Sequence, residues 1–110
     1  MANLILKEQK ELNGDRLYRY TIGNYEVTKI DKALGYTIID IDRKTRDRYT
    51  PEIYARTNWD SEQPEAFEVQ TTSYGALAGE DLQKVIAGLQ EAAEVAEALT
   101  AKFIRKEETK

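Results

Sequence analysis

The chain has 110 residues, of which 41% are hydrophobic, and its 16 basic and 20 acidic side chains give a net charge of −4. This composition is typical of one folded domain with a single core. Cysteine and histidine are both absent, which excludes disulfides, thiolate metal sites, cysteine nucleophiles and histidine-based catalysis, so we expect a non-enzymatic protein with no cofactor and no metal site.

The N-terminal third predicts a β-hairpin. Residues 3–12 are strand-like, and Asn13-Gly14 follows them directly. Both positions of that dipeptide tolerate positive φ, which makes it the strongest short-range hairpin signal. After the returning strand over residues 16–22, Gly23-Asn24 allows two interpretations, a bulge within one long strand or a second tight turn. We favour the bulge, because aromatic and β-branched residues continue on both sides.

The middle of the chain predicts three further strands. Residues 36–42 give the clearest one, with Ile39 and Ile41 on one face and Asp40 and Asp42 on the other. A second strand covers residues 48–56, where Pro51 places at least the start at an edge. The last strand covers residues 66–72, after a polar loop.

Residues 79–106 predict one long amphipathic helix, with apolar residues at three- and four-residue spacing and Glu80 and Asp81 in the first turn. Its apolar and small residues fill an arc of about 180°, wider than the roughly 100° stripe that one packing surface needs. We therefore expect a homodimer that uses this helix, although the sheet and its loops are an alternative cover for the arc. The predicted dimer contacts are Gly88, Ala92, Ala96 and Leu99.

Together these elements predict an α+β domain over residues 1–106, with a four- or five-stranded antiparallel meander over about residues 3–72 and one long C-terminal helix over about 79–106. Residues 107–110 are expected to be a disordered tail. One helix is about 10 Å across, whereas five strands span roughly 20 Å, so part of the sheet must curl, dimerise, bind something or stay exposed. The only N-terminal apolar run is residues 4–6, too short for a signal peptide or a membrane span, so a cytoplasmic location is expected.

Charge is uneven along the chain. Residues 1–56 carry 11 basic and 9 acidic side chains, a net of +2, while residues 57–110 carry 5 and 11, a net of −6. Tyrosine and arginine are interleaved in the first part, and aromatic rings stack on unpaired bases while arginines contact phosphates. Tyrosine is also simply a good strand residue, and the net negative charge argues against a dominant phosphate-binding surface. The predicted nucleic-acid-binding residues are Arg16, Tyr18, Arg19, Tyr20, Arg48, Tyr49, Tyr54 and Arg56.

The order of the predicted elements is similar to that of a known protein family. Strands followed by Phe67-Glu68-Val69-Gln70-Thr71-Thr72, a short loop and Glu80-Asp81-Leu82-Gln83-Lys84-Val85-Ile86 resemble the positive-cofactor-type transcriptional coactivators and their small bacterial relatives. The similarity is one of architecture, over about the last two thirds of the chain. Those proteins have a curved four-stranded antiparallel sheet followed by one helix. The resemblance implies a dimer that binds single-stranded DNA on its sheet.

Two other functions stay open. A protein-protein adaptor or inhibitor would use the same sheet face or the acidic helix ridge of Glu91, Glu94 and Glu97. A hydrolase or isomerase would need Asp40 and Asp42 beside a third carboxylate in a concave pocket. The nucleic-acid hypothesis instead needs most arginines of the tyrosine-arginine segments on one face, namely Arg16, Arg19, Arg48 and Arg56.

Overall fold

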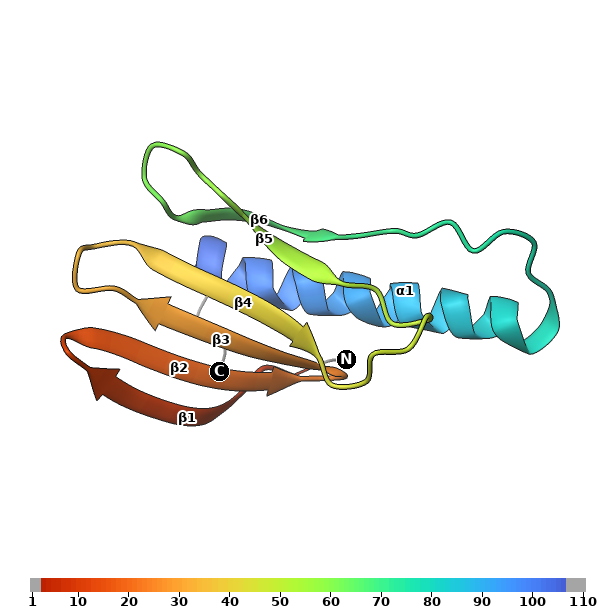
Figure 1. The fold of residues 1–110 in the computed structure, drawn as a ribbon, viewed down its shortest axis with the longest axis horizontal. Coiled ribbons are helices and arrows are strands. Elements are labelled where there is room, and N and C mark those ends of the chain that lie inside the picture. The colour runs from red at the N-terminus through yellow and green to blue at the C-terminus, as the bar shows by residue number, and fades with distance from the viewer. Residues whose placement is uncertain (1–2, 107–110) are drawn as a thin grey trace.

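The computed structural model describes residues 3–106 and confirms an α+β fold with one long C-terminal helix (Figure 1). The first four strands form an antiparallel meander in the order β1-β2-β3-β4. The helix α1 continues directly into a π-helical turn, η1. The elements are β1 (Ile5–Leu12), β2 (Asp15–Ile22), β3 (Tyr25–Asp31), β4 (Thr37–Arg43), β5 (Ile53–Thr57), β6 (Pro64–Val69), α1 (Gly79–Leu99) and η1 (Thr100–Ile104).

Two tight turns connect the first three strands. Asn13 and Gly14 have φ of 52° and 88°, so the first hairpin forms at the predicted dipeptide. At Gly23-Asn24 the favoured bulge is wrong, because Ile22 pairs with Tyr25 across a two-residue turn. The turn places both of these side chains in the core, where they are 1% and 0% exposed. Burying both large side chains on one face favours the hairpin over a single long strand.

The last two strands form a sheet of their own. β5 and β6 pair only with each other among the described residues, so the predicted single sheet divides into a four-stranded and a two-stranded part. The strand expected over residues 48–56 begins only at Ile53, because the preceding loop crosses from one sheet to the other and is held there by side chains. Pro51 in this loop is buried and lies outside both ladders.

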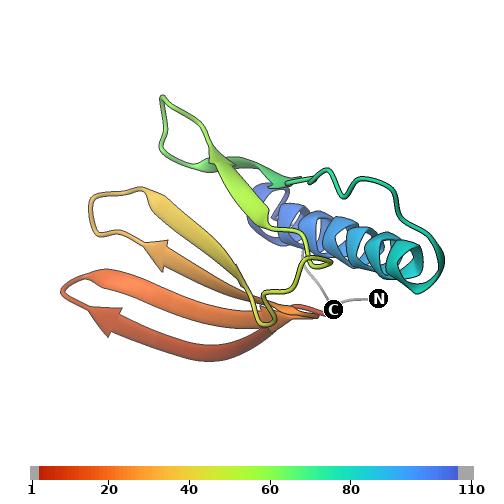
Figure 2. The same cartoon turned by 45° about the vertical axis from the view of Figure 1, so that its right-hand side comes forward.

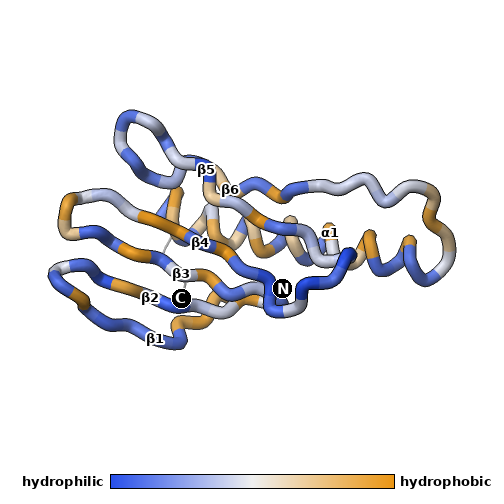
Figure 3. Tube along the Cα trace, in the orientation of Figure 1, coloured by the Kyte–Doolittle hydropathy of each residue, from blue (hydrophilic) through white to orange (hydrophobic). Residues whose placement is uncertain are grey.

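The core lies where the two sheets and the helix meet. Apolar and polar residues alternate along β2, β3 and β4 (Figure 3), so each of these strands turns one apolar face toward α1. We call this the inner face of the four-stranded sheet, and the opposite side its outer face. The buried cluster contains Ile22, Tyr25, Val27, Ile39, Ile53, Phe67, Ala92, Val95, Ala96 and Leu99.

Cover over the four-stranded sheet is incomplete. The two-stranded sheet diverges from it, and α1 runs alongside the two-stranded sheet (Figure 2). All eight residues of β1 are exposed, whereas β3 contributes two fully buried side chains. The single helix therefore does not cover the whole sheet, as its width predicted. An open hollow remains on the inner face.

Candidate functional site

A cleft opens where the inner face of β2, β3 and β4 meets the end of the helix. Its volume is about 460 Å³, and it lies between the four-stranded sheet and η1. Ile39, Thr37, Gln63 and Pro64 complete its walls. We call it the lysine-aromatic cleft after its chief lining residues, which are Tyr18, Tyr20, Lys29, Lys102, Phe103 and Lys106.

Three aromatic rings form one wall of the cleft. Tyr18 and Tyr20 are alternate residues of β2 and so share the inner face, with ring centroids 6.5 Å apart and nearly parallel planes. Phe103 from η1 meets Tyr20 edge to face, with a centroid distance of 5.4 Å. Burial raises the pKa of Tyr20, and nearby Tyr18 and Asp31 add to the shift. The wall therefore offers ring surface from two elements that are far apart in sequence.

Lys29 holds a positive charge against that wall. It pairs with Tyr18 in the β2-β3 register, and its Nζ lies 5.0 Å from the Tyr18 ring centroid and 5.6 Å from that of Phe103. The same Nζ is 3.2 Å from Asp31 Oδ2, while the Thr37 hydroxyl donates to Asp31 Oδ1 at 3.0 Å. Lys29 is therefore fixed in position by one carboxylate and two rings.

The other two lysines of the cleft are less constrained. Lys102 and Lys106 form no ion pair with any residue in the range 3–106. With Lys29 they place three positive charges beside a single carboxylate, Asp31. The cleft is thus locally basic in a chain whose net charge is −4.

The structure brings only two of the eight predicted nucleic-acid residues into this cleft, namely Tyr18 and Tyr20. Arg19, between them, lies on the outer face, with its Nε 3.3 Å from Glu8 Oε1. Arg16 is exposed and pairs with Asp31 in the strand register. The arginines of β2 therefore divide between the two faces of the sheet.

The remaining four predicted residues lie elsewhere. Arg48 lies beside the ring of Tyr49, whose hydroxyl donates to Asp81 at 2.7 Å near the start of α1. On β5, Arg56 is neutralised by two glutamates at 3.0 and 3.3 Å, and Tyr54 donates its hydroxyl hydrogen bond to Glu52. The four arginines do not share one face, so the structure does not assemble the continuous platform that the composition predicted.

Sequence reasoning missed the basic part of the cleft. Lys29 follows Tyr25 and Val27 at strand spacing and so puts a positive charge on the face that those two residues bury, which is a usable signal. Lys102, Phe103 and Lys106 belong to the helix end, and no local pattern indicates that they meet β2 and β3. Only the tertiary packing of η1 places them there.

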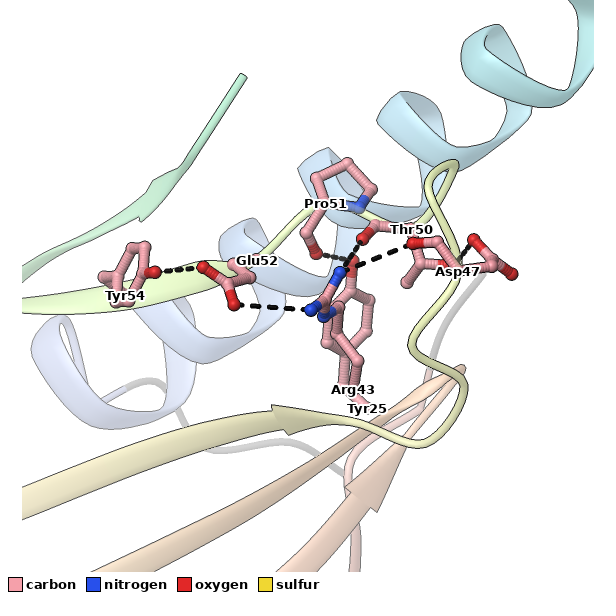
Figure 4. Close-up of polar contacts among 7 residues, drawn as sticks. All are labelled: Tyr25, Arg43, Asp47, Thr50, Pro51, Glu52 and Tyr54. Atoms are coloured by element: carbon pink, nitrogen blue, oxygen red, sulfur yellow. Dashed lines mark hydrogen bonds and ion pairs between the residues drawn. The ribbon is translucent and has the colours of Figure 1, made fainter. Parts of the chain in front are cut away.

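A polar cluster joins β4 to the loop before β5 (Figure 4). Arg43 donates from Nη1 to the Thr50 carbonyl at 2.9 Å, and its Nη2 lies 3.3 Å from Glu52 Oε1. The buried Tyr25 hydroxyl donates to the Pro51 carbonyl at 2.6 Å. These bonds satisfy loop carbonyls near the core, so we assign the cluster a structural role.

The predicted dimer residues are packed inside the chain. A Cβ on Gly88 would lie 2.0 Å from the Tyr49 carbonyl oxygen, which shows that the loop occupies this seam. Ala92 and Leu99 are 0% exposed and Ala96 is 9% exposed. In this conformation the chain itself buries the three helix side chains, and close approach of its own loop explains the glycine, which is partly buried. The homodimer itself stays a prediction.

The two aspartates considered for catalysis lie in a hollow with a third carboxylate. Asp40, Asp42 and Glu52 line one hollow of about 300 Å³ between β4 and β5. However, Glu52 is already bonded to Arg43 and Tyr54, and no group of three potential metal-binding side chains exists within residues 3–106. The hydrolase or isomerase alternative therefore stays a hypothesis.

Comparisons with protein-family models, with curated proteins and with solved structures give no match for this chain. Over the described range, no helix combines the length and the apolar character that crossing a membrane requires. The predicted tail at residues 107–110 lies outside the described residues. The geometry of the lysine-aromatic cleft is therefore the main ground for a proposed function.

Proposed function

We propose that the protein binds a short stretch of single-stranded nucleic acid in the lysine-aromatic cleft. The observation that carries this proposal is the convergence of three aromatic rings and three lysines in one hollow with a single carboxylate. Rings of this kind stack on unpaired bases without regard to sequence, and lysines neutralise the phosphates between them. The volume of about 460 Å³ lies within the usual range of small ligand sites.

The division of roles follows from the contacts. Tyr18 is half-buried at the cleft wall and offers ring surface for stacking, while Lys29 is held in place by Asp31. Lys102 is exposed at the mouth of the cleft, and Lys106 also lines it. If two or three lysines contact phosphates, the logarithm of the binding constant should fall with the logarithm of salt with a slope of about −1.4 to −2.1.

In a fluorescence-anisotropy titration of labelled oligo-dT and oligo-U, we expect Tyr18→Ala to weaken binding about 10-fold, through loss of one stacked base. Lys102→Glu should weaken binding by a similar factor and reduce the salt slope by about 0.7 per lost phosphate contact.

Two matched variants serve as controls. Tyr54→Ala removes an exposed tyrosine of β5, and Lys84→Glu makes the same charge change on α1 beside Tyr49, both outside the cleft. Neither should change the affinity. The proposal fails if the wild-type chain does not bind at low salt, or if the control variants lose as much affinity as the cleft variants.

A further inference from the structure

β1 is a free edge of the four-stranded sheet. It pairs with β2 on one side, and no other described strand pairs with it. Leu12 and Asp15 flank a two-residue turn, where the flanking residues of a hairpin form a hydrogen-bonded pair. By alternation from that pair, the backbone N–H and C=O of Gln9 point away from β2. Such free donors and acceptors are a template for a further strand.

The charges of β1 complement each other about Gln9. Glu8 and Lys10 flank this residue, and both side chains lie on the outer face of the sheet. If an antiparallel copy is centred on the same residue, Glu8 of each copy lies opposite Lys10 of the other. A two-fold axis centred on Glu8, Lys10 or Glu11 would instead place two like charges directly opposite each other. The charge pattern therefore selects Gln9 as the centre.

The bulge in β1 extends this match to both ends of the strand. Lys7 is the extra residue, so Ile5 and Leu12 each lie three ladder positions from Gln9, counted on their β2 partners. Both side chains lie on the outer face and are 49% and 53% exposed. In a copy paired about Gln9 they would lie opposite each other and remove apolar surface from water.

We propose that two copies of the chain pair antiparallel through β1, with a two-fold axis that passes between the two Gln9 residues, perpendicular to the sheet. The product is one continuous eight-stranded sheet. Backbone hydrogen bonds between the two Gln9 residues lie at its centre, and Glu8 forms an ion pair with Lys10 on either side. Ile5 meets Leu12 at each end of the interface.

The charged side chains are available for this pairing. Lys10 forms no ion pair with any residue in the range 3–106. Glu8 Oε1 lies 3.3 Å from Arg19 Nε, and its second carboxylate oxygen can accept from a lysine of the other copy. One edge strand of 8 residues buries little surface, so we expect a weak dimer. Dilute protein is then monomeric, with β1 open as an edge strand.

The two lysine-aromatic clefts lie on the same side of this dimer. Because the axis is perpendicular to the sheet, the inner faces of both copies stay on one side. Gln9 pairs with Tyr18, so the two Tyr18 positions lie in one row, separated by three strand spacings or about 14 Å. The dimer does not depend on nucleic-acid binding, because no residue of β1 lines the cleft.

Sedimentation equilibrium from micromolar to submillimolar protein tests the interface. We expect the wild-type chain to dimerise. Lys10→Glu and Glu8→Lys should each raise the dimer dissociation constant about 5- to 100-fold, because the symmetry places like charges opposite each other twice. Lys84→Glu and Glu94→Lys make the same charge changes at exposed positions of α1 and should leave the constant unchanged. Circular dichroism checks that each variant is folded.

Mixing the two edge variants tests the register. In a dimer of one Lys10→Glu chain and one Glu8→Lys chain, every residue 8 again faces a residue 10 of opposite charge. The equimolar mixture should therefore dimerise at least about 5-fold more tightly than either variant alone. The proposal is overturned if the wild type stays monomeric, if the α1 controls weaken the dimer as much as the edge variants, or if the mixture is no tighter than its components.

Gln9→Pro tests the backbone pairing at the axis. The proline removes an N–H that points away from β2, so the β1-β2 ladder keeps its donors while the dimer loses two central hydrogen bonds. We expect the dissociation constant to rise at least about 10-fold. Gln9→Ala is the control, because it keeps the N–H, and it should stay within about 3-fold of wild type. A folded Gln9→Pro variant that dimerises like the wild type would overturn the proposal.

Discussion

Tyr25 connects the sheet to the loop that precedes β5. Its side chain is 0% exposed on the inner face of β3, and its hydroxyl donates to the Pro51 carbonyl at 2.6 Å. Burial, reinforced by the negative charge of Glu91, raises the pKa of Tyr25 to about 12. The neutral phenol is therefore the form that the fold stabilises, because the phenolate could not donate this hydrogen bond.

Replacing Tyr25 by phenylalanine should lower the free energy of unfolding by about 1–3 kcal/mol, because the buried Pro51 carbonyl loses its donor. The raised pKa also makes the free energy of unfolding depend on pH. Its stabilising contribution is fully present below pH 10, where the phenol of the unfolded chain is also neutral, and is lost as pH rises through 12. Urea unfolding at neutral pH and between pH 10 and 12 measures both effects.

Tyr54→Phe is the control for this prediction, because Tyr54 is exposed and its hydroxyl donates to the side chain of Glu52. It should change the free energy of unfolding by less than about 0.5 kcal/mol. Equal losses in the two variants would contradict the role given to the buried hydroxyl. So would a tyrosine absorbance titration in which every phenol ionises near its ordinary pKa.

At the scale of the element, α1 is shaped by the loop against which it packs. Val85, Ala92 and Ala96 are buried along one side, and Gly88 lies among them where the Tyr49 carbonyl approaches the helix backbone. A glycine inside a helix costs about 1 kcal/mol relative to alanine. Here the cost is offset by close packing between the helix and the loop. From the sequence pattern alone, a second chain could equally have packed against this glycine.

Gly88→Ala should destabilise the protein by about 1–3 kcal/mol despite its better helix propensity, because the added Cβ would displace the Tyr49 carbonyl. Thermal unfolding measures the change. Gln90→Ala, at an exposed position of the same helix, should be neutral or slightly stabilising. A more stable Gly88→Ala variant would show that the loop does not occupy this seam.

For the whole molecule, the uneven cover over the sheet decides which surfaces are available. β3 is paired on both sides and contributes Tyr25 and Val27 to the core, whereas β1 is an edge strand with no buried residue. The lysine-aromatic cleft lies on the inner face of the four-stranded sheet, where η1 leaves part of that face uncovered. The incomplete cover over the inner face therefore leaves this cleft open.

Native-state hydrogen exchange should reflect this gradient. Backbone amides of β1 are expected to exchange first, because opening an exposed edge strand uncovers little apolar surface, and those of β3 should exchange last. Mass spectrometry or NMR can follow the two strands in one sample. Equal protection of β1 and β3 would contradict the gradient.

The sequence by itself determined the local structure. Alternation along residues 36–42 assigned Ile39 inward and Asp40 outward, and Asn13-Gly14 located the first turn. Three- and four-residue spacing placed the helix to within two residues at its end. These features depend on backbone preference and on which face is buried, and both are encoded in neighbouring residues.

Only the tertiary structure decided how distant segments meet. Three contacts between distant segments show this: β5 pairs only with β6 among the described residues, a loop carbonyl lies beside Gly88, and Phe103 packs against Tyr20. The sequence pattern of each segment was also compatible with other partners. The same applies to Lys29 and Lys102, which are 73 positions apart in the sequence yet line one cleft. Periodicity indicates which side of an element is buried, whereas the packing of complete elements selects what lies against it.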